Sequence, residues 1–167
     1  DDVADGCEDG RIASPSLSRA PPPRWAAPNI ALSLHEIDGA REKEAAWAKV
    51  KEHHYMDDKF ANMAVCYNAR LDDTCDAAVG SAGELVGFVA ALPQPGVKEE
   101  GRSHDASRVC FREHRLVVLP RFQGLGIGPC VSECLASHML RAHRRRYICR
   151  TAHPALGRWR EKSALWE

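Results

Sequence analysis

Between positions 109 and 143 the chain passes from a valine-rich run through a glycine-rich turn into a segment with helical periodicity. Pro120 ends the apolar run, and Gly124, Gly126 and Gly128 follow it. Glycines let the backbone turn sharply and bring main-chain N–H groups close to a ligand, because no Cβ atom stands in the way. The first N–H groups of a helix lack partners and carry the positive end of its dipole. The sequence therefore predicts an anion-binding turn at residues 123–128.

Two familiar phosphate-binding motifs do not fit this turn. A Walker A loop needs Lys and then Ser or Thr after its last glycine, but Pro129 and Cys130 stand there. The dinucleotide fingerprint needs a further glycine at position 129 or 131, and these residues are Pro129 and Val131. The pattern that remains is Gln-x-x-Gly-x-Gly after a strand that ends in proline. A plain strand-to-helix connection is the alternative interpretation.

The segments around the turn predict a mixed α/β domain at residues 29–167. The first four strands follow one another in a way typical of an antiparallel meander. The helix after the turn joins the last two strands as one βαβ unit, so these two strands should lie parallel. Strands are predicted at residues 30–37, 61–69, 84–92, 109–119 and 146–151, helices at 41–53, 129–143 and 154–166, and an exposed loop at 94–106.

Residues 1–28 are predicted to be a disordered, proline-rich tail or linker. They contain Asp, Gly and Ser in irregular order and then three consecutive prolines, with too little apolar material to fold alone.

Charge and cysteine content narrow the function classes. The 23 basic and 23 acidic residues balance, so the sequence shows no basic excess of the kind typical of nucleic-acid binders. No apolar run is long enough to span a bilayer. The seven cysteines form no Cys-x-x-Cys pair, which favours an intracellular, reducing compartment and no metal site. Cys130 and Cys134 are predicted to lie on the buried face of the helix, with Val131, Leu135, Met139 and Leu140.

The segment from Arg115 to Gly128 resembles the acetyl-CoA signature of the GNAT superfamily of N-acetyltransferases, and the predicted order of elements over residues 29–167 is similar. In particular, His114 to Pro120 and Thr151 to Pro154 look like segments of a bacterial and phage-associated GNAT group. The resemblance implies a GNAT-like acyl-CoA N-acyltransferase fold that lacks the final two strands, acetyl-CoA as cofactor, and a small-molecule or protein amine as acceptor. An edge strand left exposed would invite a homodimer or a complex with another chain.

Cofactor contacts are carried over from this resemblance. The main chain of the strand before the turn would pair with the pantetheine arm, and the amides of the turn would hold the pyrophosphate. His153 stands where many members carry an asparagine that contacts the cofactor. The residues so implied are Leu116, Val117, Val118, Gln123, Gly124, Leu125, Gly126, Ile127, Gly128 and His153.

Two candidate bases lie side by side on the fourth predicted strand. Direct attack by an amine on the thioester requires a group that accepts the amine's proton. His114 has a suitable ordinary pKa, and Glu113 precedes it. Neighbouring strand residues point to opposite faces, so without a bulge only one can face the cleft. The alternative is that both are surface residues or ion-pair partners.

Acceptor-side residues and departures from the family pattern complete the predictions. His53, His54 and Tyr55 end the first predicted helix and border the acceptor site, or else simply form a dipole-favoured helix end. Pro129 lacks an amide that many members use for phosphate, and Trp159 and Arg160 fall near the place of the usual acid tyrosine. The sequence therefore leaves two functions open: a working acetyltransferase, and a weak or inactive GNAT-like module for CoA binding or interaction.

Overall fold

The computed structural model describes residues 28–55, 60–94 and 110–166. Its sheet has five strands in chain order, in which β1 to β4 run antiparallel and β5 lies parallel to β4. This arrangement confirms the predicted mixed α/β class, the meander and the parallel final unit. The strands are β1 (Leu32–Ile37), β2 (Val65–Leu71), β3 (Leu85–Gln94), β4 (Cys110–Val118) and β5 (Tyr147–Ile148). The predicted tail at 1–28 and loop at 94–106 lie almost wholly outside the described residues.

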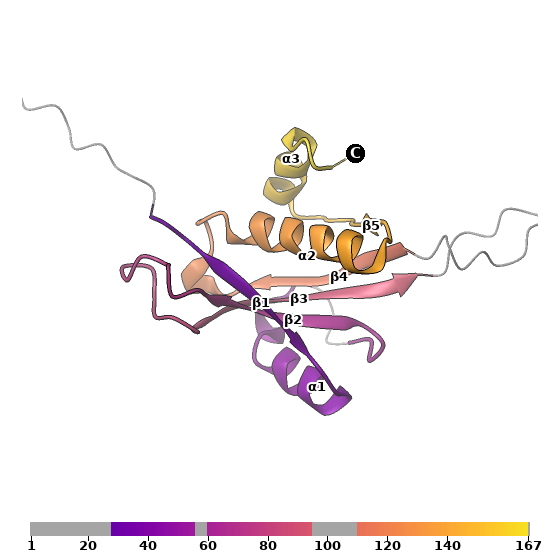
Figure 1. Cartoon of the computed structure of the whole chain (residues 1–167), viewed down its shortest axis with the longest axis horizontal. Helices are drawn as coiled ribbons and strands as arrows, with labels where there is room; N and C mark the ends of the chain where they lie inside the picture. The colour runs from indigo at the N-terminus through magenta and orange to yellow at the C-terminus, as the bar shows by residue number, and fades with distance from the viewer. Residues whose placement is uncertain (1–27, 56–59, 95–109, 167) are drawn as a thin grey trace, which may run out of the picture.

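Helices cover both faces of the sheet. α1 (Ala40–Ala48) lies on one face, and α2 (Ile127–His143) and α3 (Pro154–Lys162) lie on the other (Figure 1). Each face has its own apolar cluster: Trp47, Val50 and Phe88 are buried on the α1 side, and Val89 and Leu135 on the α2 side. The short 3₁₀ turns η1 (Lys51–His53) and η3 (Pro120–Phe122) follow α1 and β4.

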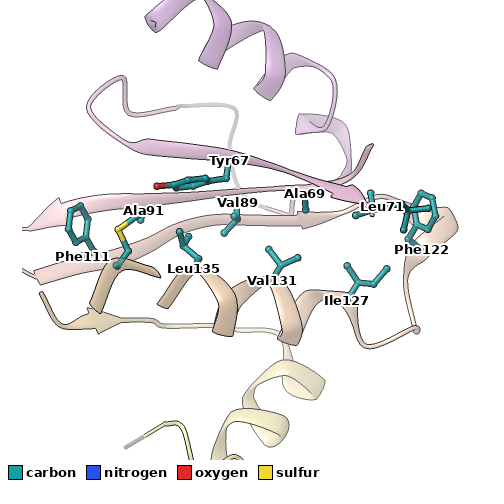
Figure 2. Close-up of a cluster of buried hydrophobic side chains, with 12 residues drawn as sticks. Tyr67, Ala69, Leu71, Val89, Ala91, Phe111, Phe122, Ile127, Val131 and Leu135 are labelled. Atoms are coloured by element: carbon teal, nitrogen blue, oxygen red, sulfur yellow. The ribbon is translucent and has the colours of Figure 1, made fainter. Parts of the chain in front are cut away.

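The buried stripe of α2 differs from the predicted one. Side chains spaced four residues apart from Ile127 to Met139 face the sheet and pack against β2 and β3 (Figure 2). Cys130 and Cys134 are exposed, and Leu140 is 56% exposed. Their prediction as core residues was wrong, because the helix turns a narrower stripe of side chains to the sheet than the sequence pattern implied. The buried residues of α2 are Ile127, Val131, Ser132, Leu135 and Met139.

α2 begins at Ile127, two residues before the predicted start. Gly126 is its N-cap, with a left-handed φ of 79°, a conformation that favours glycine. Pro129 therefore occupies the third helical position, where the amide would have no partner within the helix. Proline costs no helical hydrogen bond there, and α2 runs uninterrupted to His143.

α1 is shorter than predicted and ends at Ala48 instead of His53. Val50 leaves the helical conformation, with a φ of −124°, and its side chain is fully buried. The predicted stripe of Trp47, Val50 and His54 still packs together, since the rings of Trp47 and His54 lie 5.6 Å apart. A 3₁₀ turn therefore replaces the end of the predicted helix.

β5 is much shorter than the predicted strand at 146–151. It pairs with β4 only through Phe111 with Tyr147 and Arg112 with Ile148, reinforced by the Phe111 amide donating to the Arg146 carbonyl at 2.8 Å. Beyond these pairs β4 continues to Val118 while the other chain leaves the sheet. Among the residues that the structure describes, no strand pairs with the β5-side edge of β4 from Glu113 to Val118.

The α2 face supplies a direct test of this core. Leu135 is fully buried among β2, β3 and α2 residues, so Leu135→Ala should lower the free energy of unfolding by about 2–5 kcal/mol in urea denaturation. Leu140→Ala, on the exposed side of the same helix, is the matched control and should change it by no more than about 0.5 kcal/mol. Equal effects would contradict the placement of α2.

Candidate functional site

The glycine turn presents its main-chain amides without covering them. Gly124 and Gly126 have positive φ values of 82° and 79°, and a Cβ atom built on either would meet nothing within 4 Å. At Gly128 a Cβ atom would meet only a methyl of Val118, at 3.6 Å. Within the described residues no hydrogen bond uses the amides of positions 124–128. Five main-chain donors are therefore left at the N-terminus of a 17-residue helix, and a helix N-terminus is a favourable place for an anion.

Gln123 plays a different part from the one predicted. Its amide donates to the Pro120 carbonyl at 3.2 Å, so it is already engaged within η3. Its side-chain Nε2 donates to the Val118 carbonyl at 2.9 Å. Arg121 ties the same turn to Glu84 through an Nη1–Oε1 contact of 2.6 Å. Gln123 and Arg121 thus fix the turn, and the free amides begin at Gly124.

The free edge of β4 offers the main-chain groups of alternate residues. The Leu119 amide donates to the Val86 carbonyl at 2.9 Å, and antiparallel residues alternate between the partner strand and the opposite edge. Val117 therefore bonds to β3, which corrects its prediction as a main-chain contact for pantetheine. Leu116 and Val118 direct their main-chain groups toward the β5 side, where Gln123 already occupies the Val118 carbonyl.

The two candidate bases lie on opposite faces of the sheet, as neighbouring strand residues ordinarily do, and a β-bulge follows at His114. Ala90 pairs with Arg115 and Ala91 with Glu113, so His114 is an extra residue between them. His114 and Arg115 consequently both face the α1 side: the ring of His114 lies 5.9 Å from the ring of Phe60, and the guanidinium of Arg115 lies 5.8 Å from the Trp47 ring.

His114 sits in surroundings that keep its ring uncharged. Burial, followed by the charges of Arg115, Arg112 and His54, lowers the pKa of His114 from 6.5 to about 4. The Ala61 amide donates to Nε2 at 3.4 Å, and Arg115 Nη1 lies 3.3 Å from Nδ1. Both neighbours are hydrogen-bond donors, which favours a ring nitrogen that accepts.

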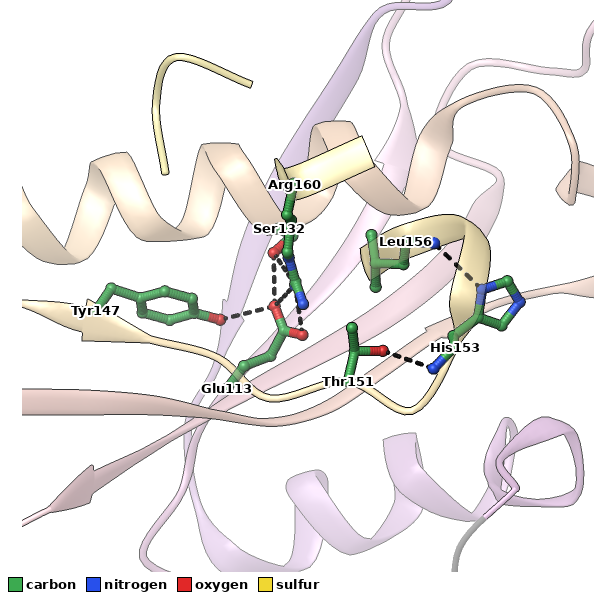
Figure 3. Close-up of polar contacts among 7 residues, drawn as sticks. All are labelled: Glu113, Ser132, Tyr147, Thr151, His153, Leu156 and Arg160. Atoms are coloured by element: carbon green, nitrogen blue, oxygen red, sulfur yellow. Dashed lines mark hydrogen bonds and ion pairs between the residues drawn. The ribbon is translucent and has the colours of Figure 1, made fainter. Parts of the chain in front are cut away.

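Glu113 lies on the α2 side in a buried polar network (Figure 3). Arg160 Nη2 donates to both of its carboxylate oxygens, at 2.8 and 2.9 Å, and each of the two side chains is 7% exposed. Ser132 and Tyr147 donate to the same carboxylate at 2.6 and 3.2 Å. Burial and the Glu113 carboxylate raise the pKa of Tyr147. These contacts favour the ion-pair interpretation of Glu113 over the interpretation as a base.

Only some of the predicted acceptor-side residues lie near His114. The His54 ring stacks on Tyr55 at 4.9 Å and contacts Trp47, and its charge reaches His114. The rings of Trp47 and Phe60 stack at 5.9 Å beside it. His53 is turned to solvent, where its Nε2 lies 3.4 Å from Glu52. His54 therefore lies near His114, whereas His53 does not share the aromatic cluster.

His153 has a structural task at the start of α3. Its Nδ1 accepts a hydrogen bond from the Leu156 amide at 3.4 Å, and its own amide donates to Thr151 Oγ1 at 3.1 Å (Figure 3). Nδ1 is therefore used as a helix cap. Its predicted contact with the cofactor stays a prediction.

The sequence missed the residues that engage Glu113. Ser132 stands next to Val131 in a mostly apolar stretch of α2, and Tyr147 opens a basic-flanked strand. Only Arg160 carried a signal, as one of two residues near the place of the family's tyrosine. The side chains of Ser132 and Arg160 are both buried.

Other features of the described residues add no second chemical centre. They contain no group of three potential metal ligands, and none of their helices has both the length and the apolar character to cross a bilayer. An open groove of about 660 Å³ lies along α2, away from the predicted site residues. It is lined by Glu133, Cys134, Ser137, His138, Arg141, Ala142 and Leu165.

Comparison with known sequences gives no match: neither a protein-family model nor a curated protein matches the chain. Comparison with solved structures is informative about the fold. The aminoglycoside N-acetyltransferase AAC(6')-Iy, solved with the bisubstrate analogue CoA-S-monomethyl-acetylneamine, is similar with a TM-score of 0.52 and 12% identity over 82% of this chain and 91% of that chain.

Two further structures show the same likeness. Glucosamine-6-phosphate N-acetyltransferase from Arabidopsis thaliana has a TM-score of 0.50 at 12% identity, over 79% of this chain and 89% of that chain. An aminoglycoside acetyltransferase from an uncultured soil metagenomic sample has 0.51 at 14%, over 81% and 92%. The chain therefore has the GNAT N-acetyltransferase fold. The narrower resemblance to a bacterial and phage-associated group stays a prediction.

The lowered pKa of His114 has a consequence for stability. Between pH 6.5 and about 4 the unfolded chain binds a proton at His114 that the folded chain does not, so stability falls as the pH drops through this window. The difference in unfolding free energy between the wild type and His114→Gln should shrink by about 1–2 kcal/mol from pH 7 to pH 4, a value discounted for partial exposure. Urea denaturation across this range measures it, and a pH-independent difference would contradict the buried, neutral ring.

Proposed function

We propose that this chain is an acetyl-CoA-dependent N-acetyltransferase that moves an acetyl group to a primary amine by direct attack in a ternary complex. The observation that carries the proposal is the set of five unpartnered amides at positions 124–128, at the start of α2. The GNAT fold and the free edge of β4 support it. The acceptor is a small molecule or a protein amine.

The residues of the turn fit the pyrophosphate of coenzyme A. Backbone donors at a helix start bind phosphate groups, and the space above Gly124 and Gly126 is open where a side chain would otherwise stand. Pro129 contributes no amide, which removes one donor that many family members use. Because the remaining donors run from Gly124 to Gly128, we expect binding with reduced affinity instead of none.

The free edge of β4 fits the amide-containing arm of the same cofactor. Leu116 and the Val118 amide face the β5 side and have the geometry of a strand edge that accepts another extended chain. Leu116 and Val118 are part-buried on the α2 side. Their main chain would orient the arm between β4 and the departing chain, and their side chains would shield it from water.

Acetyl-CoA, when bound, supplies the acyl group as an activated thioester. The residues of the chain then have two tasks: to stabilise negative charge on the carbonyl oxygen and to manage the amine's proton. A main-chain amide of β4 near the bulge serves the first task. His114, which faces the α1 side beside Trp47 and Phe60, is placed for the second.

His114 is uncharged at neutral pH because its pKa is about 4, so its ring nitrogen can accept a proton. A pKa this low also makes it a weak base toward an alkylammonium group. The amine should therefore lose its proton largely to solvent before attack, with His114 orienting the neutral amine. Rate should then increase with pH up to the pKa of the acceptor amine.

A second candidate function is a module that binds CoA and catalyses transfer slowly or not at all. The specific observation in its favour is the state of the two candidate bases. Glu113 is held by Arg160, Ser132 and Tyr147, and His114 is a weak base. Thiol release across a broad panel of primary amines separates the two functions, since binding without turnover throughout the panel would favour the module.

The turn can be tested with a matched pair of glycine substitutions. Gly126→Asp places a carboxylate beside the pyrophosphate and should weaken acetyl-CoA binding at least about 100-fold in calorimetry, by more than 2.7 kcal/mol. Gly83→Asp is the control, because Gly83 has a similar φ of 77° and equally open space but lies in the turn before β3. It should bind as the wild type does.

The backbone strain of the two aspartate variants should be similar, since aspartate at positive φ carries a comparable cost in each. Normal acetyl-CoA affinity in folded Gly126→Asp would rule out the turn as the site. Equal loss in both variants would show an effect of folding instead of the added charge.

A further inference from the structure

Arginine is concentrated at the end of α2, although the chain as a whole has no net charge. From Cys134 to Arg160 the sequence contains seven arginines and no Asp, Glu or Lys, while 23 basic and 23 acidic residues balance over the whole chain. Four of the seven lie within six positions, where α2 ends and β5 begins. These four form the arginine cluster: Arg141, Arg144, Arg145 and Arg146.

The side chains of the arginine cluster have no protein partner in the described residues. Arg141, Arg144 and Arg146 are exposed, and Arg145 is half-buried. Within the described residues none of the four side chains makes an ion pair, a hydrogen bond or a ring contact. Guanidinium groups bind carboxylates and phosphates through paired hydrogen bonds. The cluster therefore offers its full set of donors to an anion.

Folding accounts for only part of this charge. Arg141 lies in the last turn of α2, where a cation interacts favourably with the helix dipole. Arg144 follows with a left-handed φ of 52°, a conformation in which glycine or asparagine would be more stable. The side chains of Arg145 and Arg146 come after the helix and donate to none of its carbonyl groups. These arginines therefore point to an anionic partner outside the described residues.

The open groove along α2 adjoins the arginine cluster. Arg141 belongs to both, and Ala142 and Leu165 line the same groove of about 660 Å³. The side chain of Leu165 is 71% exposed, and Leu140 on the same helix is 56% exposed. Exposed apolar surface beside polar groups is typical of a protein-binding site.

Two observations favour an acidic protein segment over a nucleic acid. A phosphate backbone is bound through charge and makes no use of an apolar groove. Unpaired bases stack on aromatic rings, but Tyr55 is the only aromatic among the large apolar side chains exposed in the described residues, and it stacks on His54. The ring of Tyr147, next to the cluster, is directed at Glu113 instead.

We propose that the groove and the arginine cluster together form a docking surface for an acidic, amphipathic segment of a partner protein. Apolar side chains of the segment enter the groove beside Leu165, and its carboxylates pair with the arginine cluster. Glu133 lies at the other end of the groove, where Ser163 Oγ donates to its carboxylate at 2.9 Å. The groove therefore has an acidic end and a basic end, which orients the segment with its carboxylates toward Arg141.

This docking surface is separate from the predicted cofactor site. The 17 residues of α2 span about 25 Å. The glycine turn precedes the first residue of the helix, and the arginine cluster surrounds its last (Figure 1). A partner segment can therefore dock whether or not coenzyme A is bound.

Fluorescence anisotropy with a labelled peptide tests the docking surface on the full chain. The probe has about 15 residues of glutamate and leucine, with leucines at the i, i+3, i+4 and i+7 spacing of an amphipathic helix. Arg141→Gln with Arg146→Gln should weaken its binding about tenfold at low salt, because both charges face the carboxylates of the peptide. Leu165→Ala should weaken it about fivefold through lost apolar contact.

Matched substitutions away from the groove are the controls. Arg41→Gln with Lys49→Gln removes the same charge from exposed positions in and just after α1, on the other face of the sheet. Met63→Ala shortens an apolar side chain that is 68% exposed. Both control variants should bind the peptide as the wild type does.

Several results would overturn the docking surface. They are no binding of the peptide to the wild type, equal loss in the cluster variant and the α1 variant, and no effect of Leu165→Ala. Tighter binding of a single-stranded RNA of equal charge would make the cluster a nucleic-acid surface instead. An all-glutamate peptide that binds as tightly as the amphipathic one would exclude the groove. Circular dichroism checks folding, and should the cluster variant not fold, Leu165→Ala and the all-glutamate peptide decide.

Discussion

The separation of β4 from β5 after only two paired residues is the constraint on which the rest of the site depends. A longer parallel ladder would occupy the main-chain groups of Leu116 and Val118 and would close the space next to the glycine turn. Two contacts fix the glycine turn at the end of β4. Gln123 donates a hydrogen bond to the Val118 carbonyl, and Arg121 forms an ion pair with Glu84. The free amides of the turn and the free edge of β4 therefore lie next to each other in the chain.

The bulge at His114 turns both His114 and Arg115 to the α1 face of the sheet, while Glu113 lies on the α2 face. On the α1 side, His114 and Arg115 lie among aromatic rings, and the low pKa of His114 leaves a neutral imidazole. On the α2 side, Glu113 forms a buried ion pair with Arg160.

Local patterns in the sequence predicted the elements that depend on neighbouring residues. The glycine turn, the four-stranded meander and the parallel last unit all follow from spacing and from the breaks at Pro120 and Gly126. Features that depend on distant contacts were missed. The early end of α1 follows from the burial of Val50, and the partners of Glu113 come from α2, β5 and α3, as far away as position 160. Cys130 and Cys134 matched a helical pattern whose buried stripe is narrower than that pattern implied.

The central claim is that the amides of positions 124–128 hold the pyrophosphate of coenzyme A. Amide NMR of the full chain during an acetyl-CoA titration tests it most directly. The account predicts large shifts of the Gly124, Gly126 and Gly128 amides, with smaller shifts at Leu116 and Val118. Saturating acetyl-CoA that left these amides unchanged, or that shifted only residues of the groove around Glu133 and Leu165, would contradict it.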